Sequence, residues 1–205
     1  MSIPTTTLAR IRAHNPCEPG YKKLCKWLGG IRTYGKDTPV TVRQIVEING
    51  LDDALWCLRT MPEHGARWRL LAERYARRAR HLMTDPRSLK ALDVAERHAR
   101  GLATDAELEA AAAAAWAAAL DAEDDVTEAA ARASAMAAEG DAEGAAGAAA
   151  EAVSVEAAAE FSADAAAAAL ASAAAAEVSA AEGAAWTSER QWQADELIRI
   201  SEEEV

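Results

Sequence analysis

The densest group of side chains that could do chemistry is a run of acids in the second half of the chain. Five carboxylates fall within eight residues: Asp121, Glu123, Asp124, Asp125 and Glu128. A carboxylate acts as a general acid or base when it is partly desolvated in a cleft beside oriented partners. Solvent-facing acids in the first turn of a helix are already explained by the helix dipole. We therefore interpret these five residues as a partner-binding surface and not as catalytic residues.

The cysteines and histidines do not have the spacing of a metal site. A structural zinc site takes four converging ligands, usually in closely spaced pairs, whereas Cys17, Cys25 and Cys57 are scattered along the chain. An odd number of irregularly spaced cysteines favours reduced thiols over a disulfide framework. The sequence also has no phosphate-binding glycine loop, nucleophile elbow or zinc-protease helix. We predict a protein that is not an enzyme and needs no metal or cofactor.

Charge and composition divide the chain into two halves. Residues 1–100 hold 19 basic and 10 acidic residues, a net charge of +9, and residues 101–205 hold 3 basic and 23 acidic residues, a net charge of -20. The segment Ala103–Ala185 contains 44 alanines, and no proline follows Pro86. We predict a basic helical domain over 1–101 and an acidic, alanine-rich helical region over 102–205. Such an asymmetry is typical of a charged partner, or of one half docking on the other.

The first half shows short helical patterns separated by turn signals. Thr38-Pro39 and Asp85-Pro86 both have the form of a helix cap followed by proline. No segment alternates with a period of two, so we expect no strands. We predict helices over 7–14, 21–28, 39–49, 51–60, 62–83 and 86–100.

The second half is predicted to be helical throughout. Thr104 and Glu107 form a capping box that opens a helix to about residue 122, and Asp124 opens a second helix that ends at Gly140. The later helices are expected over 141–161 (weakened by two glycines), 162–182 (stopped by Gly183) and 188–200.

Alanine has the highest helix propensity and lets helix axes approach closely. The predicted fold is all-α: a compact N-terminal helical domain followed by an alanine-rich bundle or array of antiparallel helices. The large side chains expected to pack in that array are Trp116, Met136, Phe161, Leu170, Trp186 and Trp192. No run of about 20 large apolar residues exists, and the N-terminus lacks the form of a secretory signal, so we expect a cytoplasmic protein without a membrane span.

A second candidate surface is basic. Arginines crowd the predicted helix over 62–83, and the alternative partner-binding set is Arg67, Arg74, Arg77, Arg78 and Arg80. The helices over 42–49 and 51–59 have the outline of a helix-turn-helix. The second of them, however, would present Asp52 and Asp53 to the phosphates. We do not expect nucleic acid as the partner of that motif.

Three stretches of the first half have a recognisable sequence: Asn49–Arg59 (NGLDDALWCLR), His81–Ser88 (HLMTDPRS) and Ala91–Gly101 (ALDVAERHARG). Together they resemble an alanine-rich family of phage and prophage immunity proteins. The resemblance covers about residues 1–120 and the closing Gln191–Gln193. It implies a non-catalytic protein that neutralises a toxin or a defence system. Relatives repeat tryptophan and arginine through the alanine-rich part, whereas here acids largely replace the arginines.

The sequence thus favours a phage-type inhibitor, of the immunity or anti-CRISPR-like kind, that blocks a host defence or toxin protein. The acidic half could do so by imitating the charge of nucleic acid. Two alternatives stay open. The chain could be a self-assembling structural protein, hence a homo-oligomer, or it could bind nucleic acid through the arginine-rich first half.

Overall fold

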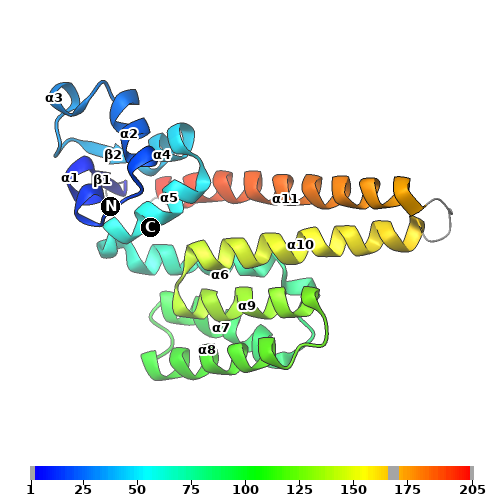
Figure 1. The fold of residues 1–205 in the computed structure, drawn as a ribbon. Helices are drawn as coiled ribbons and strands as arrows, with labels where there is room; N and C mark the ends of the chain where they lie inside the picture. Colours follow the sequence, from blue (N-terminus) through cyan, green and yellow to red (C-terminus); the bar gives the residue numbers. More distant parts are fainter. Residues whose placement is uncertain (1–2, 166–170, 204–205) are drawn as a thin grey trace. The chain divides into compact units, whose positions relative to one another are not determined.

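The computed structural model describes residues 3–165 and 171–203, and the side chains of residues 3–156 and 179–203. Within these ranges the protein is helical apart from one small sheet, so the predicted all-α class is confirmed (Figure 1). The chain groups into two compact units, Met1–Trp68 with Gln193–Val205 (unit 1) and Arg69–Trp192 (unit 2). The predicted division at 101/102 does not coincide with this grouping, because the helices on either side of Gly101 pack against each other within unit 2.

Unit 1 consists of short helices and a two-stranded antiparallel sheet in which Thr6 pairs with Val40. Its elements are β1 (Thr5–Thr7), α1 (Leu8–Ala13), α2 (Glu18–Trp27), α3 (Ile31–Tyr34), β2 (Pro39–Thr41), α4 (Val42–Asn49), α5 (Leu51–Cys57), η1 (Leu58–Thr60), η2 (Pro62–His64), residues 65–68 of α6 (Gly65–Arg78) and the last turns of α11 (Ala171–Glu202). Helix α4 packs on α2 and α5. The core is built from large aliphatic side chains, among them Leu8, Ile11, Leu24, Val42, Ile45 and Leu55.

The predicted cap at Thr38-Pro39 is wrong. Pro39 lies in strand β2, and α4 begins three residues later, behind a capping box in which the Thr41 hydroxyl accepts from the Gln44 backbone N–H at 3.2 Å. Proline is accepted at the first position of a short strand because it has no N–H to donate there. The strands were missed because three residues are too few to show an alternating pattern.

The helix predicted over 62–83 is shorter than expected. Its middle is α6, which is flanked by the 3-10 helices η2 and η3 (Arg80–Leu82). Trp68, Leu71 and Tyr75, which lie three and four residues apart along it, are buried. A 3-10 turn repeats every three residues, so it continues the apolar i, i+3 pattern of an α-helix. The pattern in the sequence therefore indicates the buried face of this segment but not the residues at which α6 begins and ends.

Unit 2 is an array of longer helices with well-formed caps. Its elements are the rest of α6, η3, α7 (Pro86–Ala99), α8 (Asp105–Leu120), α9 (Asp125–Glu139), α10 (Ala142–Ala165) and α11 as far as Trp192. The predicted caps at Asp85, Thr104 and Asp124 are confirmed, and Gly140 ends α9 with a left-handed φ of 79°. Helix α9 packs against α7, α8 and α10.

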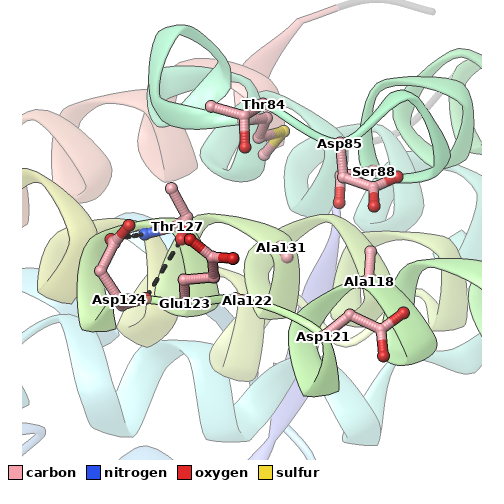
Figure 2. A pocket seen from close by; sticks show the side chains of 11 residues that line it. Thr84, Asp85, Ser88, Ala118, Asp121, Ala122, Glu123, Asp124, Thr127 and Ala131 are labelled. Atoms are coloured by element: carbon pink, nitrogen blue, oxygen red, sulfur yellow. Dashed lines mark hydrogen bonds between the residues drawn. The ribbon is translucent and has the colours of Figure 1, made fainter.

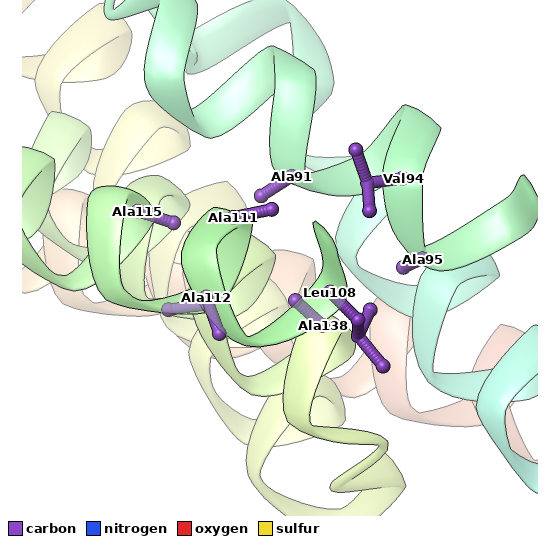
Figure 3. Close-up of a cluster of buried hydrophobic side chains, with 9 residues drawn as sticks. Ala91, Val94, Ala95, Leu108, Ala111, Ala112, Ala115 and Ala138 are labelled. Atoms are coloured by element: carbon purple, nitrogen blue, oxygen red, sulfur yellow. The ribbon is translucent and has the colours of Figure 1, made fainter. Parts of the chain in front are cut away.

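Most of the buried apolar residues of unit 2 are alanines, and Figure 3 shows one cluster of them. One cluster joins α7, α8 and α9 through the buried residues Ala91, Val94, Ala95, Leu108, Ala111, Ala112, Ala115, Ala135 and Ala138. Each methyl group buries little area, so stability here comes from many close helix contacts and from alanine's helix propensity.

The large side chains expected in the array behave differently from one another. Trp116 and Met136 are half-buried, and Trp192 packs edge-on to Tyr75 with ring centroids 6.1 Å apart. Trp186 is 42% exposed, so its prediction as a core residue is wrong. The side chains of Phe161 and Leu170 lie outside the described residues.

Two predicted helix boundaries in the second half are also wrong. Helix α10 continues through its two glycines and through residues 162–165, where a new helix was expected to begin. Helix α11 continues through Gly183, where a stop was expected. An isolated glycine costs a helix about 1 kcal/mol relative to alanine, and the alanines around it offset that cost. None of the helices in the described ranges is both long and apolar enough to span a membrane.

Candidate functional site

The predicted acids meet at the corner between α8 and α9 in unit 2. Asp121 is the C-cap of α8, and Asp124 is the N-cap of α9, where its side chain accepts from the Thr127 backbone N–H at 2.8 Å. Asp125 and Glu128 lie in the first turn of α9, where the helix dipole favours negative charge. We call the set Asp121, Glu123, Asp124, Asp125 and Glu128 the acidic corner.

Members of the acidic corner differ in how far the chain already neutralises them. Asp121 accepts from Arg87 at 2.8 Å, and Glu128 lies 3.5 Å from an arginine one turn further along α9. Glu123 and Asp125 are exposed and form no ion pair with any residue in the described ranges. The corner therefore keeps uncompensated negative charge at its surface.

A pocket of about 320 Å³ lies beside the acidic corner, between the start of α7, the end of α8 and the start of α9 (Figure 2). Four of the residues that line it are acids: Asp85, Asp121, Glu123 and Asp124. Its lining contains no lysine, arginine or histidine. The pocket is thus a concave continuation of the negative surface.

Arg87 is the cation that holds this region together. Its guanidinium donates to Asp85 at 2.7 Å and to Asp121 at 2.8 Å, which ties the start of α7 to the end of α8. The guanidinium and backbone N–H of Arg87 both donate to Asp85 and lower the pKa of that carboxyl. The sequence identified Asp85 only as a helix cap, because no local pattern reveals that it faces a helix more than thirty residues away.

Ser88 is the second residue of this site that sequence reasoning missed. It is fully buried, it lines the pocket, and its hydroxyl has no hydrogen-bond partner among the described residues. The oxygens of Asp85 and Ser88 point from α7 towards Ala118 and Ala131 on α8 and α9 (Figure 2). A serine within a helix carries no signal in the sequence that its hydroxyl will lack a partner.

The alternative basic set does not form an open stripe of free guanidinium groups. Arg67 is buried and donates to a backbone carbonyl of α11 at 3.1 Å, and Arg77 pairs with carboxylates of α6 and α7. Arg78 donates to a buried carboxylate of α11 at 3.0 Å and stacks on Trp192. Arg74 is half-buried and also has a partner within the chain. Arg80 alone of the five is exposed without a partner in the described ranges.

A second and more open groove of about 520 Å³ runs along α8. Arg69 lines it, donates to the carbonyl of Ala138 at 3.1 Å, and has its pKa lowered by burial. Trp116 donates to Glu139 at 2.7 Å on another wall. Both polar groups already bond other residues that line the groove, so this groove carries less binding potential than the pocket beside the acidic corner.

No metal centre is formed by the part of the chain that the structure describes, since no three histidine, cysteine or acidic side chains are suitably grouped there. The three thiols are free: Cys17 is exposed, Cys25 is half-buried and Cys57 is buried. Burial raises the pKa of the Cys57 thiol to about 12. That thiol is therefore protonated at neutral pH and a poor nucleophile.

Comparison of the chain with family models, curated proteins and solved structures finds no match. The resemblance to phage immunity proteins stays a prediction.

Proposed function

We propose that this protein is a non-enzymatic inhibitor, of the phage-encoded immunity or anti-defence kind, that binds a host defence or toxin protein and blocks its functional surface in the host cytoplasm. The observation that carries the proposal is the acidic corner with its unpaired Glu123 and Asp125. Asp125 lies in the first turn of α9, and Glu123 lies in the short connection between α8 and α9, whose facing ends are fixed by capping hydrogen bonds.

A fixed display of carboxylates suits a partner that normally binds nucleic acid. Duplex DNA carries one negative charge for about every 1.7 Å of its axis, and proteins that bind it present lysine and arginine in a groove. Carboxylates on ordered helix ends lose little conformational freedom when they enter such a groove, so more of the electrostatic gain remains as affinity. The acidic corner would compete with nucleic acid for that surface.

The basic alternative is less well supported. Four of its five arginines already contact carboxylates, carbonyls or other groups of the chain. A guanidinium that is paired in this way must give up its partner before it can neutralise a phosphate. Self-assembly through opposite charges remains the second candidate, and the experiment below separates it from inhibition.

The test compares two triple variants of the full chain with equal change in net charge. The corner variant is Asp121→Asn, Asp124→Asn and Asp125→Asn, in which asparagine keeps the capping ability of position 124. The matched control removes three exposed acids elsewhere: Asp37→Asn, Glu109→Gln and Glu182→Gln. Each immobilised protein captures host proteins from a lysate, and a protein retained by the wild type is then purified for affinity measurement.

The corner variant is expected to bind that protein at least about tenfold more weakly at low salt, because each exposed charge pair at 4 Å is worth about 1 kcal/mol in water. The control variant should bind nearly as the wild type does. Wild-type affinity should also fall steeply as salt is raised. Equal binding by both variants would contradict the proposal. Light scattering that reveals salt-sensitive self-association instead, with no retained protein, would favour the structural alternative.

A further inference from the structure

The pocket beside the acidic corner has features that a simple display of surface charge does not need. It is concave, four carboxylates line it, and so does a buried hydroxyl that has no hydrogen-bond partner among the described residues. Together these features specify the chemistry of a ligand more narrowly than the exposed corner does.

The lining of the pocket is negatively charged. The lining acids are Asp85, Asp121, Glu123 and Asp124, and the only cation bonded to any of them is Arg87, as far as the described residues show. Four negative charges therefore face one positive charge. An anionic group would meet repulsion in this pocket, and a cationic group would be attracted.

The Ser88 hydroxyl is a second and independent feature of the pocket. A buried polar group without a hydrogen bond typically costs about 1–3 kcal/mol, so a ligand atom that forms a hydrogen bond with it recovers that stability. The hydroxyl lies on the wall formed by α7, next to the Asp85 carboxylate. An N–H donor placed beside the hydroxyl would give it a hydrogen bond and would lie next to the negative charge of Asp85, which already accepts from Arg87.

The volume of the pocket and its apolar lining residues are a third feature. A volume of about 320 Å³ corresponds to about ten water molecules, which is ample for a chain of five or six heavy atoms. Ala118, Ala131 and Met83 give the pocket an apolar surface between its polar groups. A divalent metal fits less well, because no three potential ligands are grouped for one within the described ranges.

We infer that this pocket binds an alkylammonium group, whose positive charge lies among the carboxylates, whose N–H groups reach Ser88 and Asp85, and whose methylene chain packs on the alanines. Such a group occurs at the end of a lysine side chain and in free polyamines. Only the lysine source rests on the proposed function, in which a partner protein would supply it.

The experiment measures binding of n-butylammonium to the full chain by ligand-observed NMR, with n-butanol as the uncharged control of equal length. Dissociation constants near the millimolar range are expected for so small a ligand. Acetyl-lysine methylamide and putrescine are titrated in parallel. Tighter binding of the lysine compound assigns the pocket to a protein side chain, and tighter binding of putrescine assigns it to a polyamine.

Three variants test the residues. Glu123→Gln with Asp124→Asn should weaken butylammonium binding about tenfold, since each carboxylate near 5 Å contributes about fourfold in water. Asp37→Asn with Glu182→Gln is the control of equal charge, because both acids are exposed and neither lines the pocket. Ser88→Ala should weaken binding about tenfold or more, as loss of a hydrogen bond to a charged group does.

Ser134→Ala controls for the higher helix propensity of alanine, because Ser134 is also buried in a helix but donates to the carbonyl of Ala131 at 2.7 Å. The thermal midpoint of unliganded Ser88→Ala should exceed that of Ser134→Ala. Equal binding of butanol and butylammonium, or full affinity in Ser88→Ala and in the double variant, would overturn the inference. That result would leave the proposed function standing if the Asp121, Asp124 and Asp125 variant still lost its partner.

Discussion

Replacing Ala115 by leucine tests the alanine core directly. Ala115 is fully buried in the cluster that joins α7, α8 and α9. If the interior held a void, three added carbons would gain about 2.4 kcal/mol, at about 0.8 kcal/mol each. Close helix packing leaves no such space, so the side chain must push helices apart at a cost of about 1–3 kcal/mol. We expect Ala115→Leu to lower the free energy of unfolding by that amount.

Urea unfolding followed by circular dichroism measures this change, and the thermal midpoint should fall by roughly 3–10 °C. Ala110→Leu is the matched control, because Ala110 is exposed on the same helix. Its midpoint should stay within about 2 °C of the wild type. If Ala115→Leu is as stable as Ala110→Leu, α8 does not pack against α7 and α9 as described, and the acidic corner loses its rigid support.

Three further predictions concern two glycines and an exposed ion pair. Gly140→Ala should destabilise the protein by about 1–2 kcal/mol, because Gly140 has a φ of 79° and an added Cβ would lie 2.9 Å from Arg69. Gly147→Ala should stabilise it by about 0.5–1 kcal/mol in the same thermal assay, since that glycine is helical and open space surrounds its Cβ position. Hydrogen bonds from Arg10 lower the pKa of Glu63 to about 2, so this pair should stabilise unit 1 fully above about pH 4.5 and lose its effect as the pH falls towards 2. In Arg10→Gln, NMR should find the pKa of Glu63 raised towards its ordinary value of 4.5, with a backbone hydrogen bond still lowering it; a value still near 2 would contradict the assignment.

Local signals predicted much of the fold. The caps at Thr104 and Asp124 and the glycine end of α9 depend on hydrogen bonds within a few residues, and the structure has them where the sequence indicates. The errors arise where the local structure depends on the surrounding residues or on residues distant in the sequence. Gly183 does not stop α11, because the surrounding alanines sustain the helix. Pro39 belongs to a strand whose partner is more than thirty residues away.

The candidate site could likewise be predicted only in the part that depends on residues close together in the sequence. The acids of the corner are adjacent in sequence, so their grouping could be seen directly. The pocket could not, because Ser88 and Asp85 reach it from another helix, and their partners depend on how α7 packs on α8 and α9. For the arginines of α6, in contrast, the sequence suggests a binding surface that the structure does not form. In the sequence they resemble an open basic surface, but several form ion pairs with carboxylates distant in the sequence, such as Glu96 and Glu189.

The alanine interior also limits which sequences the second half can adopt. At buried positions such as Ala111, Ala115 and Ala138, only residues no larger than about alanine keep the helices at their present spacing. Random change is therefore tolerated mainly on the outer faces, where the acids lie. The high alanine content is therefore a steric requirement of the interior, and it leaves the exposed surface free to change without disturbing the packing of the helices.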